Sequence, residues 1–423
     1  MLDLKAIRSE PERIKAALAR RGAAEQVDEL LALDARRREL LPEVENAQAE
    51  RKTLSKQIGE RKQAGEDAEE LMATVQGLKE RIESGKEELE RVEAELGELA
   101  LTLPNLPDPD APEGMSEEDA VVIREVGERP QFDFEPRDHL EIGTDLGLIE
   151  MEKAAELSGS RFAYLKGDLV LLELALVRFA IETVRAEGHE PVVPPVLVRE
   201  EALEGTGFLP EARDQIYEIP KDELFLTGTS EVGLAGLHAN EILDGAALPL
   251  RYCAFSTCFR REAGAAGRDT RGIFRVHQFD KVEMFSFVEP SASSEEHERL
   301  LAIEERILGE LEIPYRVVNV AVGDLGAPAA KKYDCEAWIP SQGRFRELTS
   351  CSNTTDYQAR RLGARYRPEE GAAAQMVHTL NGTACAVGRT IIALIENRQK
   401  SDGGFTLPKT LHRYGAPERI PAR

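Results

Sequence analysis

The chain has 423 residues, a length that suggests two or three domains, and 42% of its residues are hydrophobic, which is enough for a sizeable buried core. Its 78 acidic residues outnumber the 54 basic ones, and the formal charge of −24 excludes a bulk, non-specific nucleic-acid coat protein while leaving room for a local basic strip. Because there is no apolar leader, no run of 18 apolar residues and no C-x-x-C pair among five cysteines, we expect a cytoplasmic protein with free thiols.

The first hundred residues predict an N-terminal helical domain over residues 1–100. A short helix is expected over 1–27, and apolar residues then recur at alternating steps of three and four from Leu30 to Ile58 and from Leu71 to Leu99. Steps that average 3.5 residues are typical of a coiled-coil seam. The polar stretch between the two runs contains no proline. The pattern therefore predicts an antiparallel coiled-coil hairpin over about residues 30–100.

Four prolines in residues 101–112 end the second helix and predict a stiff linker over 101–118. The third segment, 119–423, mixes short apolar runs typical of strands with helical patterns. The strands are expected at 223–228, 250–255, 273–279 and 281–289, and the helices at 168–187, 229–243, 292–311, 353–362 and 386–399. Because strands and helices do not alternate strictly, we expect an α+β domain with an antiparallel sheet.

The chemistry of this domain is concentrated in an arginine-rich hairpin. Glycine-rich phosphate loops and hydrolase motifs are absent from the sequence. Instead, two strand-like runs flank a loop that contains Gly264, Gly267, Arg268, Arg271 and Gly272. A guanidinium fork matches phosphate oxygens in two-point contact, so such a hairpin can hold a triphosphate between Arg260 and Arg275. By composition alone, a solvated hairpin with surface charges is an equal alternative.

The order of three segments in this hairpin resembles motif 2 of the class II aminoacyl-tRNA synthetases: FRRE at 259–262, GRDTRG at 267–272 and RVHQFDKVE at 275–283. The resemblance to the seryl-tRNA synthetase family extends over nearly the whole chain, through MLDLKAIRSEPE at the start, LSGSRFAYLKGDL at 157–169, GTGFLP at 205–210, LTGTSE at 226–231, RELTSCSN at 346–353 and TLNGTACAVGRTIIALIEN at 379–397. It implies a class II antiparallel-sheet catalytic domain over 119–423. It also implies ATP-dependent activation of L-serine to seryl-adenylate and transfer to tRNA(Ser), with tRNA(Sec) as a second substrate where the host has one.

The resemblance also implies roles for individual residues. ATP would contact Arg260, Arg261, Glu262, Arg275, Val276, Phe279, Glu347, Leu348, Thr349, Ser350 and Arg389. Arg260, Glu347 and Arg389 would be the catalytic residues, and Mg²⁺ would bind with ATP at Glu347 and Ser350. L-serine would contact Thr229, Ser230, Glu231, Glu283, Asn381 and Thr383, and the sequence leaves open which carboxylate takes the ammonium and which the hydroxyl. The structural alternatives are a helix cap at Thr229, strand packing at Phe279 and a surface charge at Glu347.

The predicted hairpin has an uneven charge along its two helices. Residues 31–64 hold 8 basic and 6 acidic side chains, whereas residues 65–100 hold 4 and 12. The resemblance implies that this arm grips tRNA(Ser), with phosphate contacts expected at Arg51, Lys52, Lys56, Arg61 and Lys62. A solvated coiled coil with internal ion pairs is the alternative. Arg51 also falls on a seam position, where it could set the packing.

Two further expectations concern assembly and function. Pro195 resembles the motif 1 proline at the interface of a homodimer, although a plain edge-strand or loop proline explains it equally from sequence alone. Two rival functions are a paralogue that loads a small amino acid onto another carrier and a non-catalytic RNA-binding scaffold. The predicted arm argues against the first rival, and the intact set Arg260, Glu262, Phe279, Glu347 and Arg389 argues against the second.

Overall fold

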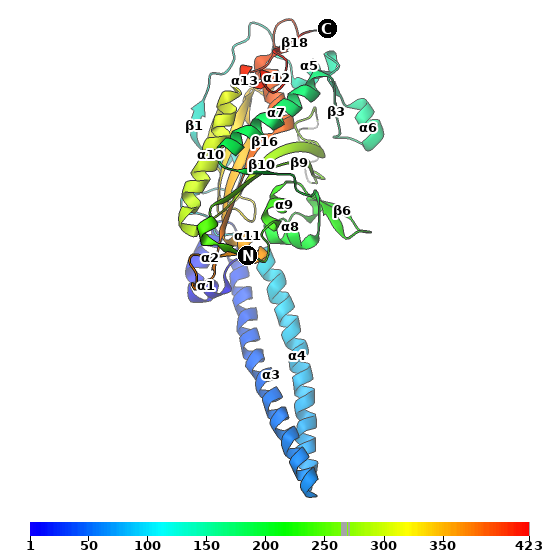
Figure 1. Ribbon diagram of the computed structural model, residues 1–423, viewed down its shortest axis with the longest axis vertical. Helices are drawn as coiled ribbons and strands as arrows, with labels where there is room; N and C mark the ends of the chain where they lie inside the picture. The colour runs from blue at the N-terminus through cyan, green and yellow to red at the C-terminus, as the bar shows by residue number, and fades with distance from the viewer. Residues whose placement is uncertain (264–268, 270, 423) are drawn as a thin grey trace. The chain divides into compact units, whose positions relative to one another are not determined.

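The computed structural model describes residues 1–263, 269 and 271–422 and divides into two compact units (Figure 1). One unit spans Leu2–Leu103, and the other comprises Met1 with the chain from Pro104 onward. Gly264, Gly267 and Arg268 of the expected loop lie outside the described residues. Within the described part of the chain, none of the helices has the length and apolar character needed to cross a membrane.

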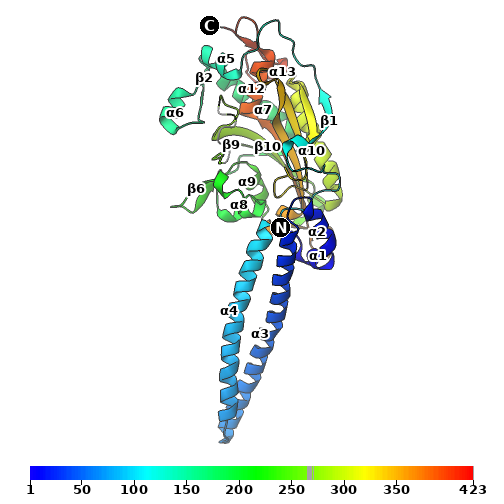
Figure 2. The same ribbon diagram turned by 180° about the vertical axis from the view of Figure 1, so that it is seen from behind.

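The first unit contains α1 (Leu4–Ser9), α2 (Pro11–Ala19), α3 (Glu25–Ala64) and α4 (Glu69–Thr102). The long helices α3 and α4 run side by side as an antiparallel pair, which confirms the predicted hairpin (Figure 2). The single short helix predicted over 1–27 was wrong, because the chain breaks into α1 and α2 at Glu10. Pro11 disfavours a helical backbone in the residue before it, and Glu10 has φ −136° and ψ 49°.

The contact between α3 and α4 follows the predicted seam. Ala47 packs against Leu78 and Ile82 in a small apolar cluster. Farther along, Gly85 gives the helices room to approach, since a Cβ there would lie 2.8 Å from Cγ2 of Val44. Arg51 also occupies a seam position but its side chain is exposed, whereas Leu54, the next seam residue toward the tip, packs against the same apolar cluster.

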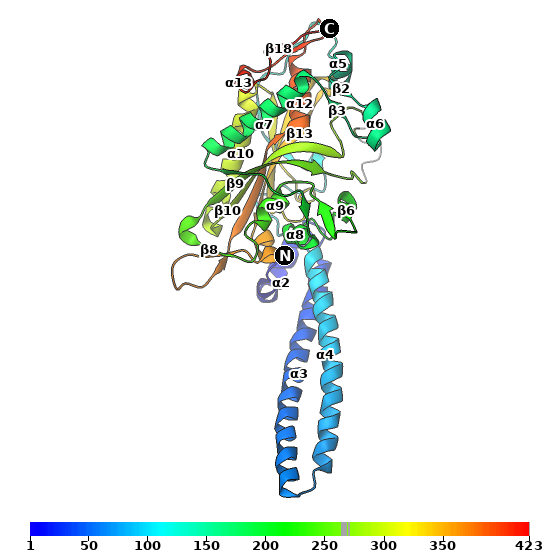
Figure 3. The same cartoon turned by 45° about the vertical axis from the view of Figure 1, so that its right-hand side comes forward.

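Among the residues described, the second unit is built on an eight-stranded sheet whose strand order is β1-β11-β12-β13-β16-β10-β9-β4. Figure 3 shows β9 and β10 of this sheet side by side. All of its pairs are antiparallel except β4 with β9, which confirms the predicted antiparallel sheet. The bounds are β1 Val121–Val126, β4 Glu190–Val192, β9 Leu250–Phe259, β10 Gln278–Val288, β11 Tyr315–Asn319, β12 Lys331–Ile339, β13 Arg344–Thr355 and β16 His378–Ala386.

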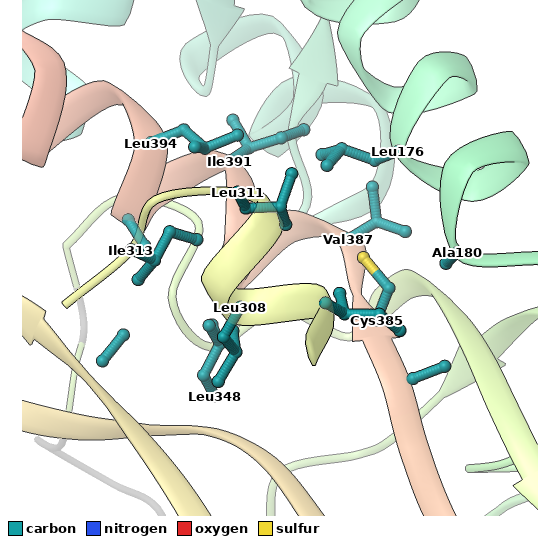
Figure 4. Close-up of a cluster of buried hydrophobic side chains, with 14 of the residues drawn as sticks. Leu176, Ala180, Leu308, Leu311, Ile313, Leu348, Cys385, Val387, Ile391 and Leu394 are labelled. Atoms are coloured by element: carbon teal, nitrogen blue, oxygen red, sulfur yellow. The ribbon is translucent and has the colours of Figure 1, made fainter. Parts of the chain in front are cut away.

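Three helices, α7 (Asp168–Ala186), α10 (Ser293–Glu310) and α12 (Val387–Arg398), contact this sheet and bury the main core. Figure 4 shows Leu176 of α7 close to Ile391 of α12, and Ala180, Leu394 and, from α10, Leu308 belong to the same cluster. Because side chains alternate along a strand, the sheet residues that face these helices are apolar and the opposite face is free to carry polar groups.

Smaller elements surround the sheet. The helices are α5 His139–Asp145, α6 Glu152–Ser158, α8 Glu200–Thr206, α9 Glu231–Gly236, α11 Tyr357–Leu362 and α13 Lys409–His412. The strands form pairs or triplets: β2 Ile149–Glu150 and β3 Tyr164–Leu165; β5 Leu197–Val198, β6 Tyr217–Ile219 and β7 Leu224–Leu226; β8 Ile242–Asp244, β14 Arg365–Arg367 and β15 Gln375–Met376; β17 Phe405–Thr406 and β18 Arg419–Ile420.

Several predicted bounds were wrong. The strand predicted over 273–279 begins only at Gln278, because residues 273–277 form turns and bends. In this segment Phe274 contacts Arg346 and Arg275 contacts Glu262. The helix predicted over 229–243 is limited to α9. The helix predicted from residue 353 starts at Tyr357, because residues 353–355 complete β13.

Candidate active site

A cavity of about 280 Å³ lies on the polar face of the sheet, where β9, β10, β13 and β16 meet. It brings together side chains that the sequence places far apart, among them Arg260, Glu347 and Arg389. Fourteen residues expected to bind ATP or serine line it: Thr229, Glu231, Arg260, Glu262, Arg275, Val276, Phe279, Glu283, Glu347, Leu348, Ser350, Asn381, Thr383 and Arg389.

The side chains of three other expected site residues lie elsewhere. Thr349 stands between two cavity-lining neighbours, and its hydroxyl donates to Oε2 of Glu304 at 2.7 Å. Its side chain points to the far side of the sheet because strand residues alternate. Ser230 is buried against Ser256, with 2.7 Å between the hydroxyl oxygens. The guanidinium of Arg261 lies 5.8 Å from the ring centroid of Tyr217.

At one end of the cavity, guanidinium groups gather around carboxylates and an aromatic ring. Arg260 lies 5.2 Å above the ring of Phe279, and its Nε donates to the carbonyl oxygen of Gly228 at 3.2 Å. Arg275 donates through Nη1 to Oε2 of Glu262 at 2.5 Å, and its Nε lies 3.8 Å from Oδ2 of Asp269. Arg275 is therefore already paired with carboxylate oxygens, whereas Arg260 donates to a backbone carbonyl oxygen.

Glu347 reaches the cavity because β13 bulges at Leu348. Cys335 of β12 faces Thr349, but the next residue, Glu336, faces Glu347, which leaves Leu348 without a partner in the register. Such a bulge re-aims neighbouring side chains: Glu347 lines the cavity, while Leu348, which also borders it, belongs to the main hydrophobic core (Figure 4).

The Glu347 carboxylate lies among cations. Nη1 of Arg389 donates to the carbonyl oxygen of Glu347 at 2.9 Å and lies 3.4 Å from its Oε2. Burial acts to raise the pKa of Glu347, but the positive charges of Arg389 and Lys332 outweigh it. The pKa of Glu347 therefore lies below its usual range, and the group is ionised at neutral pH.

The other end of the cavity contains a buried ion pair. Nζ of Lys281 lies 2.5 Å from Oε2 of Glu283 and donates to Oγ1 of Thr229 at 2.8 Å. Oγ1 of Thr383 donates to the same Glu283 oxygen at 3.4 Å. Lys281 was not among the predicted site residues. Its position two residues before Glu283 on one strand was the available signal, since residues two apart share a face.

Glu231 is a second buried carboxylate at this end, and its environment differs. Its Oε1 accepts a hydrogen bond from Nε2 of Gln358 at 2.7 Å. Burial, with the nearby negative charge of Glu283, raises the pKa of Glu231 to about 7. The two buried carboxylates therefore differ in their partners: the charge of Glu283 is balanced by Lys281, whereas Glu231 is bound by the uncharged amide of Gln358.

Three more side chains around the cavity were missed by the sequence analysis. Lys332 lines the cavity and lies 3.2 Å from Asp334. Phe274 also lines it, with the guanidinium of Arg346 at 4.0 Å and that of Arg389 at 4.7 Å from its ring centroid. Arg346 belongs to the segment RELTSCSN at 346–353, but its contact with Phe274 joins residues 72 positions apart, and sequence spacing cannot predict such a contact.

Comparison with known proteins matches both parts of the chain. Residues 1–107 match the family model for the seryl-tRNA synthetase N-terminal domain, and residues 216–398 match that for the class II tRNA synthetase core domain (G, H, P, S and T). A serine–tRNA ligase from Thermobifida fusca is 50% identical over 98% of this chain and 97% of the relative, and one from Rubrobacter xylanophilus is 48% identical over both full lengths.

The chain belongs to the seryl-tRNA synthetase family. Solved structures agree with this assignment. The seryl-tRNA synthetase of Pyrococcus horikoshii, complexed with ATP, is 43% identical with a TM-score of 0.93, and both chains are covered in full. The cytoplasmic serine–tRNA ligase of Naegleria fowleri, in complex with AMP, is 30% identical with a TM-score of 0.88 over 100% of this chain and 99% of that one. The family resemblance and the predicted fold class are both confirmed.

The buried ion pair at the end of this seryl-tRNA synthetase cavity leads to a stability prediction. Lys281→Met leaves the Glu283 carboxylate buried without its cation, so we expect the free energy of unfolding to fall by about 3–5 kcal/mol. Urea unfolding followed by the fluorescence of Trp338, which lies in the same unit, measures the change. The double variant Lys281→Met/Glu283→Gln should regain much of the loss. A single variant as stable as the wild type would contradict the pairing.

Proposed function

We propose that the cavity activates L-serine with ATP and that the enzyme then transfers the seryl group to tRNA(Ser). The observation that carries this proposal is the convergence of guanidinium groups, an aromatic face and two buried carboxylates in one cavity of a seryl-tRNA synthetase family member. The guanidinium groups and the aromatic face suit a bound nucleotide. The two buried carboxylates suit a small amino acid with an ammonium and a hydroxyl group.

The nucleotide fits the end of the cavity that holds Arg260 and Phe279. The ring of Phe279 offers a stacking face for adenine beside Val276, and Arg260 is placed to meet the α-phosphate. Arg275 would hold the γ-phosphate in exchange for its present carboxylate partners, Glu262 and Asp269. In this arrangement Glu262 is released to accept a hydrogen bond from the adenine amine.

The donor set around Glu347 fits a magnesium ion that arrives with ATP. An ionised carboxylate and the hydroxyl of Ser350 line the same cavity. Among the residues that the structure describes, no cluster of three acidic, histidine or cysteine side chains could hold a metal by itself. Two protein oxygens together with phosphate and water oxygens match what Mg²⁺ accepts. When bound, the ion would offset negative charge on the phosphates.

The different environments of Glu231 and Glu283 suggest how serine is held. The substrate ammonium would pair with Glu231, whose present partner is an uncharged amide. The substrate hydroxyl would meet Glu283, whose charge is already balanced by Lys281, and Thr383, which donates to Glu283. Alanine lacks the hydroxyl group and would leave these buried polar groups without their substrate partner. The site should therefore favour serine over alanine by a factor on the order of 10⁴.

The chemistry requires positioning and charge stabilisation rather than a protein nucleophile. The serine carboxylate attacks the α-phosphorus, the bond to pyrophosphate breaks, and a mixed anhydride of serine and AMP forms. Arg260 would stabilise the negative charge that builds on the α-phosphate oxygens. All five cysteines are buried, and burial raises the pKa of Cys258 close to this site, so its thiol is an unsuitable nucleophile.

The exposed basic residues of α3 support tRNA binding by the coiled-coil unit. The side chains of Arg51, Lys52, Lys56, Arg61 and Lys62 are all exposed. Lys56 lies 3.7 Å from Glu60, an exposed pair that contributes little and is easily exchanged for phosphate. Use of tRNA(Sec) as a further substrate depends on whether the host has one.

The enzyme is proposed to work as a homodimer. Pro195 is exposed, and near it Val193 is 84% exposed. On α7, Leu171 and Leu174 are 48% and 60% exposed. Apolar side chains that gather on a surface are typical of a protein interface. The cytoplasmic location stays a prediction.

Serine-dependent exchange of pyrophosphate into ATP tests the proposed function. We expect exchange with serine and, under the same conditions, on the order of 10⁴-fold less with alanine. Threonine and glycine should also fail to support it. Arg260→Ala should lower the serine-dependent rate by at least a hundredfold. Exchange with none of the four amino acids would contradict the proposal, and exchange without charging of tRNA(Ser) would point to another acyl acceptor.

The raised pKa of Glu231 predicts a pH dependence for serine. Below pH 7 the carboxyl group is protonated and cannot pair with an ammonium, so kcat/KM for serine should fall as the pH drops through about 7. Glu231→Gln should have a low kcat/KM at every pH and lose this dependence. This pH dependence is checked by measuring serine-dependent exchange at saturating ATP from about pH 5.5 to about pH 8.5, in steps of about half a pH unit. A wild-type profile that is flat across this range would rule out the assigned role.

Charge removal from one helix of the arm tests tRNA binding. The triple variant Arg51→Ala/Lys52→Ala/Lys56→Ala loses phosphate contacts, so KM for tRNA should rise at least tenfold and become less sensitive to salt. Its exchange rate should match that of the wild type. The control Lys79→Ala/Arg81→Ala/Lys86→Ala removes three exposed basic residues from α4. Equal effects of the two triple variants would contradict the assignment to α3.

A further inference from the structure

A buried histidine outside the cavity supports one of the cavity walls. His139 is the first residue of α5 and is only 4% exposed. Its side chain does not line the cavity, and the function proposed so far gives it no role. The ring nevertheless contacts the backbone of Ile273, a residue 134 positions away whose side chain does line the cavity.

The two ring nitrogens of His139 have different partners. Nε2 lies 3.2 Å from the backbone nitrogen of Ile273, and only an unprotonated Nε2 can accept a hydrogen bond from that N–H group. The proton of the neutral ring is therefore on Nδ1, which donates to Oε1 of Glu396 at 2.9 Å. The carboxylate thus sets both the tautomer and the direction in which the ring presents Nε2.

The carboxylate behind the ring is itself fixed. Glu396 belongs to α12 and is fully buried, and its two oxygens accept the backbone N–H groups of His139 and Ser341, each at 3.1 Å. Together with the ring N–H, these donors satisfy the buried charge. Because α12 packs in the main core and also carries Arg389, the ring is held by the same helix as a proposed catalytic residue.

The glycine before Ile273 leaves room for the ring. Gly272 has φ +72°, a backbone conformation that favours glycine, and a Cβ there would lie 2.1 Å from Nε2 of His139. A larger residue at this position would have to displace either the ring or the backbone. The turn and the ring therefore fit each other closely.

The residues that follow Ile273 reach the nucleotide end of the cavity. The ring centroid of Phe274 lies 4.7 Å from the guanidinium of Arg389, and Arg275 and Val276 line the same cavity. This segment precedes the first paired residue of β10, so the regular hydrogen bonds of the sheet do not hold it. The contact with the histidine ring takes their place at the start of the segment.

We propose that His139 is a positioning residue for the nucleotide, an inference that rests on the proposed function. By accepting the backbone N–H group, the ring fixes the turn from which Phe274, Arg275 and Val276 extend toward ATP. The proposed serine contacts lie on α9, β10 and β16, outside this turn. Loss of the ring therefore weakens ATP binding and leaves serine binding unchanged.

Three variants of this contact test the inference. His139→Leu removes the acceptor, so we expect the Kd of ATP with Mg²⁺, measured by calorimetry, and KM for ATP in serine-dependent exchange to rise about fivefold or more. KM for serine at saturating ATP should stay within about twofold of the wild type. Gly272→Ala disturbs the contact from the other side and should give the same selective rise. His139→Gln keeps an amide oxygen for the N–H of Ile273 and an amide N–H for Glu396, so it should restore most of the affinity for ATP.

Two controls separate positioning from stability. His139→Leu leaves the Glu396 carboxylate buried without its ring donor, and the double variant His139→Leu/Glu396→Gln removes that charge. Its free energy of unfolding should recover while its Kd for ATP stays high. Glu141→Ala, on the same helix, removes an exposed contact of 2.9 Å with Arg271 and should change the Kd for ATP by less than about twofold.

The outcomes distinguish this inference from the proposed function. Wild-type affinity for ATP in both His139→Leu and Gly272→Ala would overturn the inference. An equal rise of KM for serine, an effect of Glu141→Ala as large as that of His139→Leu, or recovery of ATP binding together with stability in the double variant would also overturn it. A wild type without serine-dependent exchange would instead overturn the proposed function, and the Kd values for ATP would still test His139.

Discussion

The arrangement of the site depends on the pairing of β10 with β9 on one side and β16 on the other. In this register Glu283 faces Ala254 of β9 and Thr383 of β16. Phe279, Lys281 and Glu283 are spaced two residues apart and all line the cavity. Because a strand rises about 3.3 Å per residue, these side chains span about 13 Å along one face. A single strand thus sets the distance between the stacking ring and the buried carboxylate, which is on the scale of an aminoacyl-adenylate.

The other face of the same strand belongs to the hydrophobic core. Val282 and Met284 are fully buried in the cluster that includes α7, α10 and α12. A shift of β10 by one residue would place Lys281 and Glu283 in that core and turn the apolar residues toward the cavity. The burial of apolar surface therefore fixes the position of the charged groups, and the cost of burying Lys281 is offset by its contacts with Glu283 and Thr229.

The sequence predicts those parts of the molecule that depend on local periodicity or on an extended motif. The 3.5-residue pattern from Leu30 to Leu99 is enough to predict the hairpin of α3 and α4, since its packing is repeated along the chain. The antiparallel sheet follows from the order of its elements. The start of β10 at Gln278 could not be predicted. Residues 273–277 have the composition of a strand but form turns that contact distant side chains, such as Arg346 against Phe274.

Partners in the site are also determined by distant contacts. Gln358 is 127 residues from Glu231, and only the folded chain places its amide on that carboxylate. The sequence could therefore identify two carboxylates but not their different surroundings. The exposure of Arg51 is a similar case, since the seam pattern predicts the face of the helix but not which seam side chains are buried.

The contacts of the arginines have a consequence for how the cavity accepts a polyphosphate. Arg275 is held by Glu262 and Asp269, and Arg346 grips Asp269 with two hydrogen bonds of 2.9 and 2.7 Å. These carboxylates lie on the anion-binding sides of the guanidinium groups. A phosphate that replaces a carboxylate exchanges one charge-assisted contact for another, so the arginine side chains need not be ordered again when the nucleotide binds. The released carboxylates are free to take new partners, and for Glu262 the exocyclic amine of a purine is a chemically suitable one.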